Sequence, residues 1–278
     1  MPARPLPHDT PAARAARARW RGVLARVSRL SAMLLLATLG GCAMQHRATP
    51  PPDWSASGQI ILVLIPDWNS SNATLRAFER SGKAWRLEGE PIPAVIGRSG
   101  AAWGLGLHPP QQGPVKREGD GRSPAGIFSI GTAFGYASSI ATALAYDALG
   151  PGEYCVDVSG SPLYNRIVDS ATAGAAAVAG STEPMRRDIH ANGDQAYKLG
   201  FVVEHNAGGL RDAGSCIFVH LWKSADSTTA GCTAMAEPAL RRLLAWLQPQ
   251  RHPLFVLLPQ AEYRRLRTAW QLPEVAEQ

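Results

Sequence analysis

The sequence lacks the features that mark several large classes of protein. It has only four cysteines in 278 residues, and none are spaced as Cys-X-X-Cys, so a zinc site is not expected. It shows no repeat, no glycine-rich phosphate loop and no sign of a second domain. The apolar run over residues 32–39 is too short to cross a bilayer, which takes about 20 residues. Hydrophobic residues make up 45% and charged residues 18%, an ordinary globular composition.

An excess of charge on the folded domain is also lacking, although the formal net charge is +6. Residues 1–41 hold seven of the 28 basic residues and one of the 22 acidic residues, which leaves 21 of each sign in the rest. The basic excess therefore belongs to the amino-terminal segment. Net charge gives no support to a nucleic-acid partner, and none is expected.

The amino-terminal segment has the order of an export signal. An arginine-rich stretch precedes the apolar run, which is followed by Gly40, Gly41 and Cys42. Residues 39–42 resemble a bacterial lipobox, in which the chain is cut before the cysteine and the thiol is lipidated. A plain signal peptide with an incidental Cys42 is the alternative. We expect a signal peptide over 1–41, a flexible tether over 42–57, and a periplasmic protein with an N-terminal lipid anchor. The residue after Cys42 is Ala43 rather than aspartate, which favours anchoring in the outer membrane.

The remaining pattern predicts a mainly β protein with few helices, in the α+β class. Apolar, β-branched runs indicate strands, and Leu240, Leu243, Leu244 and Leu247 form one apolar helix face after Pro238. A hairpin is expected around residues 81–83. Residues 101–124 are expected to be loop, residues 137–149 helix, and residues 170–182 a loop or weak surface helix. The strands are expected at 59–65, 93–97, 126–131, 199–203, 216–221 and 254–258, and a last helix at 261–270.

Two short segments hold the residues that indicate a catalytic site. His220 ends an apolar strand, and Cys232 follows Gly231 just before the predicted helix. Alone, each would be read as a core residue. Together they make a nucleophile and a base, because a helix N-terminus and an imidazolium both lower the pKa of a thiol from about 8.5. Amides around Gly231 and Cys232 are candidate donors to an oxyanion.

These residues resemble the L,D-transpeptidase catalytic domain, also called the YkuD or ErfK/YbiS/YcfS/YnhG type. The resemblance rests on His220 with residues 229–232, on the Ser-Pro-Ala-Gly-Ile-Phe stretch at 123–128, and on residues 103–108 and 203–206. It implies a β-sandwich or partly closed barrel over residues 58–260, with a helix after the cysteine and a C-terminal helix and tail over 261–278. It also implies acyl transfer on peptidoglycan stem peptides, with Cys232 as nucleophile, His220 as proton acceptor and donor, and a backbone carbonyl orienting the imidazole. Carbapenems are then expected to acylate the thiol.

The sequence departs from the pattern of that family next to the cysteine. Ala230 stands where the family has a histidine, Thr233 and Ala234 follow Cys232, and the spacing from His220 to Cys232 is short at twelve residues. The acyl acceptor therefore stays open. The alternatives are a transpeptidase, a carboxypeptidase or wall-protein-releasing hydrolase with the same chemistry, and a non-catalytic, lipid-anchored wall-binding module.

Other residues have two interpretations each. Thr229 either orients the loop or hydrogen-bonds to substrate, or it is simply a turn residue. Trp222, His205 and Asn206 either line the cleft or serve the core and its turns. With Cys42 lipidated and Cys232 reduced, Cys155 and Cys216 remain as a disulfide or as free buried thiols. No metal and no cofactor are expected, and a monomer is expected.

Overall fold

The structure, a computed structural model, describes residues 56–275. The predicted signal peptide over 1–41, the lipidation site at Cys42 and nearly all of the tether over 42–57 lie outside these residues. The expectations for the amino-terminal segment therefore stay predictions.

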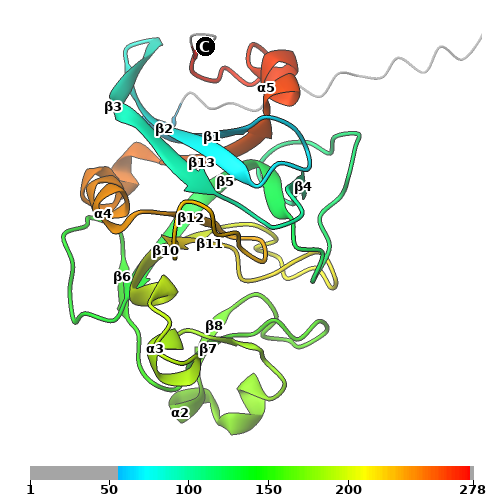
Figure 1. Ribbon diagram of the computed structural model, residues 1–278, viewed down its shortest axis with the longest axis vertical. Coiled ribbons are helices and arrows are strands. Elements are labelled where there is room, and N and C mark those ends of the chain that lie inside the picture. Colours follow the sequence, from blue (N-terminus) through cyan, green and yellow to red (C-terminus); the bar gives the residue numbers. More distant parts are fainter. Residues whose placement is uncertain (1–55, 276–278) are drawn as a thin grey trace, which may run out of the picture. The chain divides into compact units, whose positions relative to one another are not determined.

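Eight strands close into a barrel (Figure 1). Each strand pairs with the next, and β5 pairs with both β13 and β10, so the ring has no free edge. The mainly β prediction with few helices is confirmed. In order around the ring the strands are β10 (Leu199–Val203), β11 (Phe218–Leu221), β12 (Thr233–Met235), β3 (Ala84–Val95), β2 (Asn72–Ser81), β1 (Gln59–Ile65), β13 (Leu254–Pro259) and β5 (Ser123–Gly135).

The length of β5 explains why the barrel is closed rather than a sandwich or a partly closed barrel. Its first half pairs with β13, from Gly126 opposite Leu257 to Ser129 opposite Leu254. Its second half bends on to pair with β10, where Gly135 lies opposite Leu199. The sequence pattern marked only residues 126–131 of this strand as β, because polar and small residues flank that apolar stretch.

Several local predictions are confirmed and others are wrong. β1 and β10 have the predicted bounds, and the β2–β3 hairpin turns at Gly82, whose φ of 61° suits glycine. Residues 137–149 are not helical, since they form turns and the short strand β6 (Tyr146–Ala148) beside β5. The expected loop at 101–124 begins with β4 (Ala101–Trp103), which also pairs with β5.

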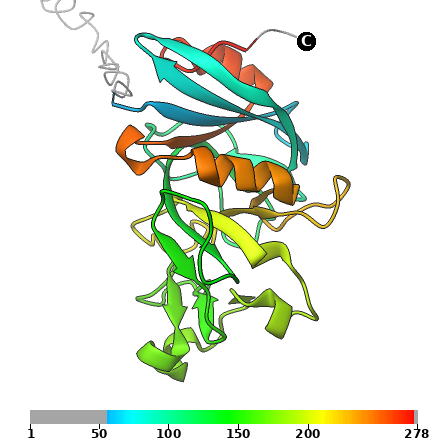
Figure 2. The ribbon, with the colours of Figure 1, turned by 90° about the vertical axis from the view of Figure 1, so that its left-hand side faces the viewer.

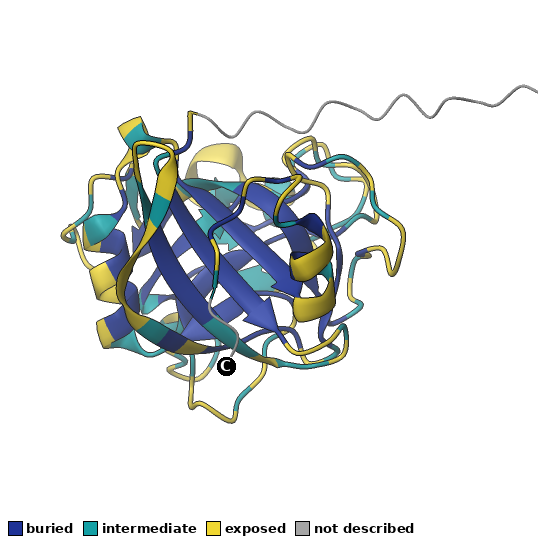
Figure 3. Cartoon of the chain, turned by 90° about the horizontal axis from the view of Figure 1, so that it is seen from above, coloured by how far each residue is buried: buried dark blue, intermediate teal, exposed yellow. Residues whose placement is uncertain are grey.

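The barrel interior is filled by aromatic and branched side chains, including Phe128, Phe201 and Phe255, all fully buried. Figure 3 shows the buried inner strands ringed by exposed loops and helix faces. Helix α4 (Glu237–Trp246) buries its predicted leucine face and lies across the side of the barrel in Figure 2. Helix α5 (Gln260–Leu266) and the segment after it also pack into this core through Tyr263 and Trp270. The C-terminal segment is therefore part of the same core rather than a separate tail.

Residues 136–198, here called the insertion, connect β5 to β10 and form the lower part of Figure 1. Apart from β6 they contain a small three-stranded sheet and short helical turns. The expected weak surface helix at 170–182 is present as two exposed turns. Within the described part of the chain, no helix has the length and apolar character needed to cross a membrane. The elements are β7 (Glu153–Cys155), β8 (Ile167–Asp169), α2 (Ser170–Ala173), η1 (Ala175–Val178), β9 (Glu183–Pro184), α3 (Arg187–His190) and η2 (Ala196–Lys198).

Candidate functional site

His220 and Cys232 are brought together by two adjacent parallel strands. His220 of β11 lies opposite Ala234 of β12, so Cys232, two residues earlier, lies beside Phe218. Alternate residues of a strand point to the same face. Val219 and Leu221 point into the barrel core, whereas Phe218 and Cys232 belong to a second cluster outside it. His220 and Cys232 therefore project from the same outer face of the barrel wall.

Both side chains line a cavity of about 390 Å³ formed by the barrel wall, the loop before Cys232 and the insertion. Ile217, Leu221 and Trp222 are also among the residues that line it. The charged residues in its lining are balanced, with four basic and four acidic. They are Arg98, Lys116, Arg187, Lys223, Glu118, Asp157, Glu183 and Asp194.

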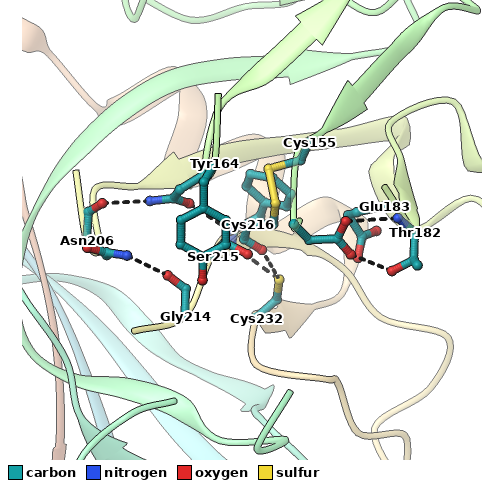
Figure 4. The surroundings of a disulfide bond; sticks show 12 residues. Cys155, Tyr164, Thr182, Glu183, Asn206, Gly214, Ser215, Cys216 and Cys232 are labelled. Atoms are coloured by element: carbon teal, nitrogen blue, oxygen red, sulfur yellow. Dashed lines mark hydrogen bonds between the residues drawn. A yellow bond between two sulfur atoms is a disulfide. The ribbon is translucent and has the colours of Figure 1, made fainter. Parts of the chain in front are cut away.

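Cys232 is the free cysteine of the described residues, and its thiol is almost fully buried. Its Sγ accepts a hydrogen bond from the Phe218 N–H at 3.3 Å and donates one to the Cys216 carbonyl at 3.4 Å (Figure 4). The pKa of the Cys232 thiol is raised to about 12, mainly by burial and also by the negative charge of Glu183, while the Phe218 N–H acts to lower it. The sulfur is therefore protonated at neutral pH.

The imidazole of His220 is held in one tautomer. Its Nδ1 lies 2.8 Å from the Leu221 carbonyl oxygen, which can only accept, so Nδ1 carries the proton and Nε2 is left as an acceptor. Burial lowers the pKa of His220 to about 4. At neutral pH the pair is thus a neutral thiol and a neutral imidazole, and the predicted imidazolium next to Cys232 is wrong for this state.

The helix that follows Cys232 does not begin where the sequence suggested. Strand β12 lies between them, and α4 begins at Glu237. A helix dipole acts within about its first turn, so α4 does not lower the pKa of the thiol. The apolar face of the helix was correctly predicted, but residues 233–235 complete a parallel strand pair with β11 instead of opening the helix.

The loop before Cys232 is fixed by Thr229. The Thr229 hydroxyl donates to the Cys232 carbonyl at 2.7 Å and accepts from the Gly231 N–H at 3.2 Å. The Thr229 N–H donates to the Ile96 carbonyl. The Ser123 hydroxyl also donates to the Cys232 carbonyl, at 3.1 Å. These contacts give Thr229 the loop-orienting role. They also occupy the Gly231 amide, which leaves the Cys232 amide as the better candidate for binding an oxyanion.

Cys155 and Cys216 form a disulfide, with a Cα–Cα distance of 5.9 Å, so the disulfide alternative holds. Cys155 ends β7 of the insertion, and Cys216 precedes β11 of the barrel. Cys216 has a φ of 56°, and its N–H donates to the Asn165 side chain at 2.8 Å. The bond thus ties the insertion to the residue whose carbonyl contacts the Cys232 thiol.

The three residues predicted to line the cleft divide into two groups. Trp222 lines the cavity, but His205 and Asn206 do not. His205 is buried against Phe128, accepts from the Leu105 N–H and lies 2.9 Å from the Ala213 carbonyl. The side-chain amide of Asn206 donates to the carbonyls of Leu210 and Gly214, and its oxygen accepts from the Leu210 N–H. These bonds hold the turn that follows β10. For these two residues the turn and core interpretation is the right one.

The insertion supplies site residues that the sequence did not single out. Tyr197 and Glu183 line the cavity, as do Arg187 and Asp194. Their only sequence signal is the density of charge at 183–194, which sequence alone would assign to a solvated surface. Among the residues described, no three His, Cys, Asp or Glu side chains are grouped so as to hold a metal ion.

Comparisons with known proteins add no assignment. A scan against protein-family models finds no match, and searches of curated proteins and of solved structures find no similar protein. The arguments for function therefore rest on the geometry of the site and on the sequence motif.

Proposed function

We propose that the protein is a peptidoglycan L,D-transpeptidase that works through an acyl-enzyme on Cys232. The observation behind this is the placement of Cys232 and His220 on one face of two paired strands, where both line one cavity and the Nε2 of His220 is left as an acceptor. A thiol and a base so arranged are the requirements of nucleophilic catalysis. The motif around Cys232 supplies the substrate class.

The neutral state of the pair defines how the first step proceeds. The thiol turns from the Cys216 carbonyl toward His220, and Nε2 takes the proton as the sulfur attacks the carbonyl of the third residue of a stem peptide. The oxyanion is held by the Cys232 amide. The imidazolium then protonates the leaving amine of the terminal D-residue, and a thioester remains. An amine acceptor then attacks the thioester carbonyl, and His220 takes the proton that the amine loses. As the carbon–sulfur bond breaks, His220 returns that proton to the sulfur, which restores the thiol and leaves a cross-link.

Incubation of the purified protein with a disaccharide-tetrapeptide, followed by mass spectrometry, tests the proposal. A cross-linked dimer with loss of one D-residue is the expected product, and Cys232→Ala abolishes it. Trimmed monomer alone would indicate the hydrolase instead. Unchanged substrate that still binds would indicate a wall-binding module and contradict the proposal.

The protein is further proposed to act in the periplasm, anchored by a lipid on Cys42 and working as a monomer. Mass spectrometry of the membrane-extracted protein tests the anchor, since a diacylated N-terminal Cys42 is the expected species. An unmodified Cys42 inside the mature chain would contradict it.

A further inference from the structure

Tyr197 covers the strands that hold the thiol and the imidazole. It lies in η2, and its side chain is buried. Its ring meets the His220 ring edge-on, with centroids 5.2 Å apart, and the Phe218 ring at 5.4 Å. Phe218 is the neighbour of Cys232 across the strand pair, and Tyr197 shares an apolar cluster with both. The tyrosine therefore packs directly over the reacting pair.

Tyr197 lines the same cavity as two hydrogen-bond acceptors, the Glu183 carboxylate and the Cys232 sulfur. Burial raises the pKa of Tyr197 well above its usual value, and the charges of Glu183 and Cys232 raise it further, so the hydroxyl remains a proton donor. Burial also raises the pKa of Glu183, whereas a hydrogen bond from Tyr197 lowers it. The same hydroxyl lowers the pKa of Cys232, against the larger effect of burial. The hydroxyl has a single proton to donate, so the Glu183 carboxylate and the Cys232 sulfur compete for it.

Glu183 is embedded in a balanced group of charges. Arg187 lies 3.0 Å from Glu183 and 3.1 Å from Asp194, and Lys223 lies 3.4 Å from Asp194. The Arg187 guanidinium also lies over the Tyr197 ring, 5.3 Å from its centre. These contacts favour the ionised form of Glu183 within the cavity. A charged carboxylate is a stronger acceptor for the hydroxyl than a neutral thiol.

We infer that Tyr197 is a positioning residue for the chemistry of Cys232. Its ring holds the His220 imidazole in place, and its hydroxyl bonds Glu183 while the thiol is protonated and turns to the sulfur when the thiolate forms. This inference rests on the Cys232 and His220 pair of the proposed function but not on the substrate. It gives the insertion a direct part in activating the thiol.

The two insertion residues should then shift the pKa of Cys232 in opposite directions. Tyr197→Phe keeps the ring and removes the donor, which destabilises the thiolate. Glu183→Gln removes a negative charge and a competing acceptor, which stabilises the thiolate. Lys116 of the loop before β5, whose charge lowers the pKa of Cys232, and His220 of β11, which lines the same cavity, are unchanged in both variants. A role in packing alone would not produce shifts of opposite sign.

The rate at which iodoacetamide alkylates Cys232 measures this in the full-length protein, between pH 8 and 10, by mass spectrometry of the peptide that contains it. One unit of pKa changes the thiolate fraction tenfold, and the accompanying change in nucleophilicity offsets about threefold of this. We expect Tyr197→Phe to slow alkylation about threefold and Glu183→Gln to accelerate it by a similar factor. Tyr263→Phe is the matched control, because Tyr263 is equally buried but bonds the Pro273 carbonyl beneath α5.

An unchanged rate in Tyr197→Phe, or shifts of the same sign in both variants, would overturn the inference. Glu183→Gln tests it independently, since that variant leaves the aromatic packing intact, and a rate at or below that of the wild type contradicts the inference. Alkylation needs no peptidoglycan. A protein that forms no cross-link but shows the opposite shifts would therefore refute the proposed function and support the role of Tyr197.

Discussion

The barrel and the insertion are built in different ways. The barrel consists mostly of long strands around apolar side chains such as Phe128 and Phe255. The insertion has strands of two or three residues and helical turns of three or four, and many of its residues at 170–182 are exposed. A disulfide and ion pairs such as Arg187 with Glu183 hold it in place.

The difference shows how the site divides its tasks. The barrel fixes where His220 and Cys232 lie, because strand register sets both positions. The insertion covers them, and burial under it makes the thiol and the imidazole neutral. Polar residues of the insertion then supply the hydrogen bonds and charges around the sulfur. A substitution in one region should therefore have a different signature from a substitution in the other.

Removing the disulfide should have the largest effect, and it acts on the insertion. The bond closes a loop with a sequence separation of 61 residues. Its loss in the double variant Cys155→Ser, Cys216→Ser should lower the free energy of unfolding by about 4 kcal/mol, because the unfolded chain gains entropy. Denaturant unfolding measures this, with proteolysis showing faster cleavage within residues 156–198. An unchanged midpoint would show that the insertion is held without the bond.

Acid should affect the two buried histidines of the barrel side and Glu183 of the insertion in opposite senses. Burial lowers the folded-state pKa values of His220 and His205 to about 4, below the ordinary value of 6.5, so the unfolded chain binds more protons between these values. Each histidine then removes stability as the pH falls from 6.5 to 4, by about 1.4 kcal/mol per pH unit. Burial raises the pKa of Glu183 in the insertion, so the folded chain binds a proton there more readily than the unfolded chain. Protonation of Glu183 therefore adds stability as the pH falls.

Denaturant titrations at several pH values isolate the contribution of His220. The acid loss of stability should be smaller in His220→Asn than in the wild type, by up to about 3 kcal/mol at pH 4. Equal pH dependence in the two proteins would show that His220 is not buried as a neutral base.

If the proposed acyl transfer takes place, His220→Asn should also lower its rate about a hundredfold, since a positioned base contributes at least that much. His252→Asn is the matched control, because His252 is exposed, is not among the residues that line the cavity and has a φ of 47° that asparagine tolerates. Turnover of the disaccharide-tetrapeptide measures both. An equal loss of turnover in the two variants would show that His220 is not the base of the reaction.

Ser123→Ala should have the smallest effect. The buried Ser123 hydroxyl accepts from the Gly97 N–H at 2.9 Å and donates to the Cys232 carbonyl. Its removal leaves a buried donor unpaired and should cost about 1–3 kcal/mol of stability. Thermal or denaturant unfolding measures this against Ser139→Ala, an exposed serine that should change nothing.

The contrast between the regions also explains what could be predicted from sequence. β1, β10 and the buried face of α4 follow from apolar periodicity, because burial in the barrel imposes it. That His220 and Cys232 lie together could be predicted because strand end, glycine and cysteine form a compact motif, and the structure places both on one cavity. Closure of the barrel was missed, since the pairing of Gly135 with Leu199 joins segments that the insertion separates. Tyr197 and Glu183 were missed because a short charged segment resembles a surface loop.

Acylation by a carbapenem, followed by intact-mass measurement, tests the role of Cys232 most directly. The wild-type protein should gain one drug mass on the peptide that contains Cys232, and Cys232→Ala should gain none. A wild type without an adduct, or the same adduct on Cys232→Ala, would contradict the assignment of Cys232 as the nucleophile.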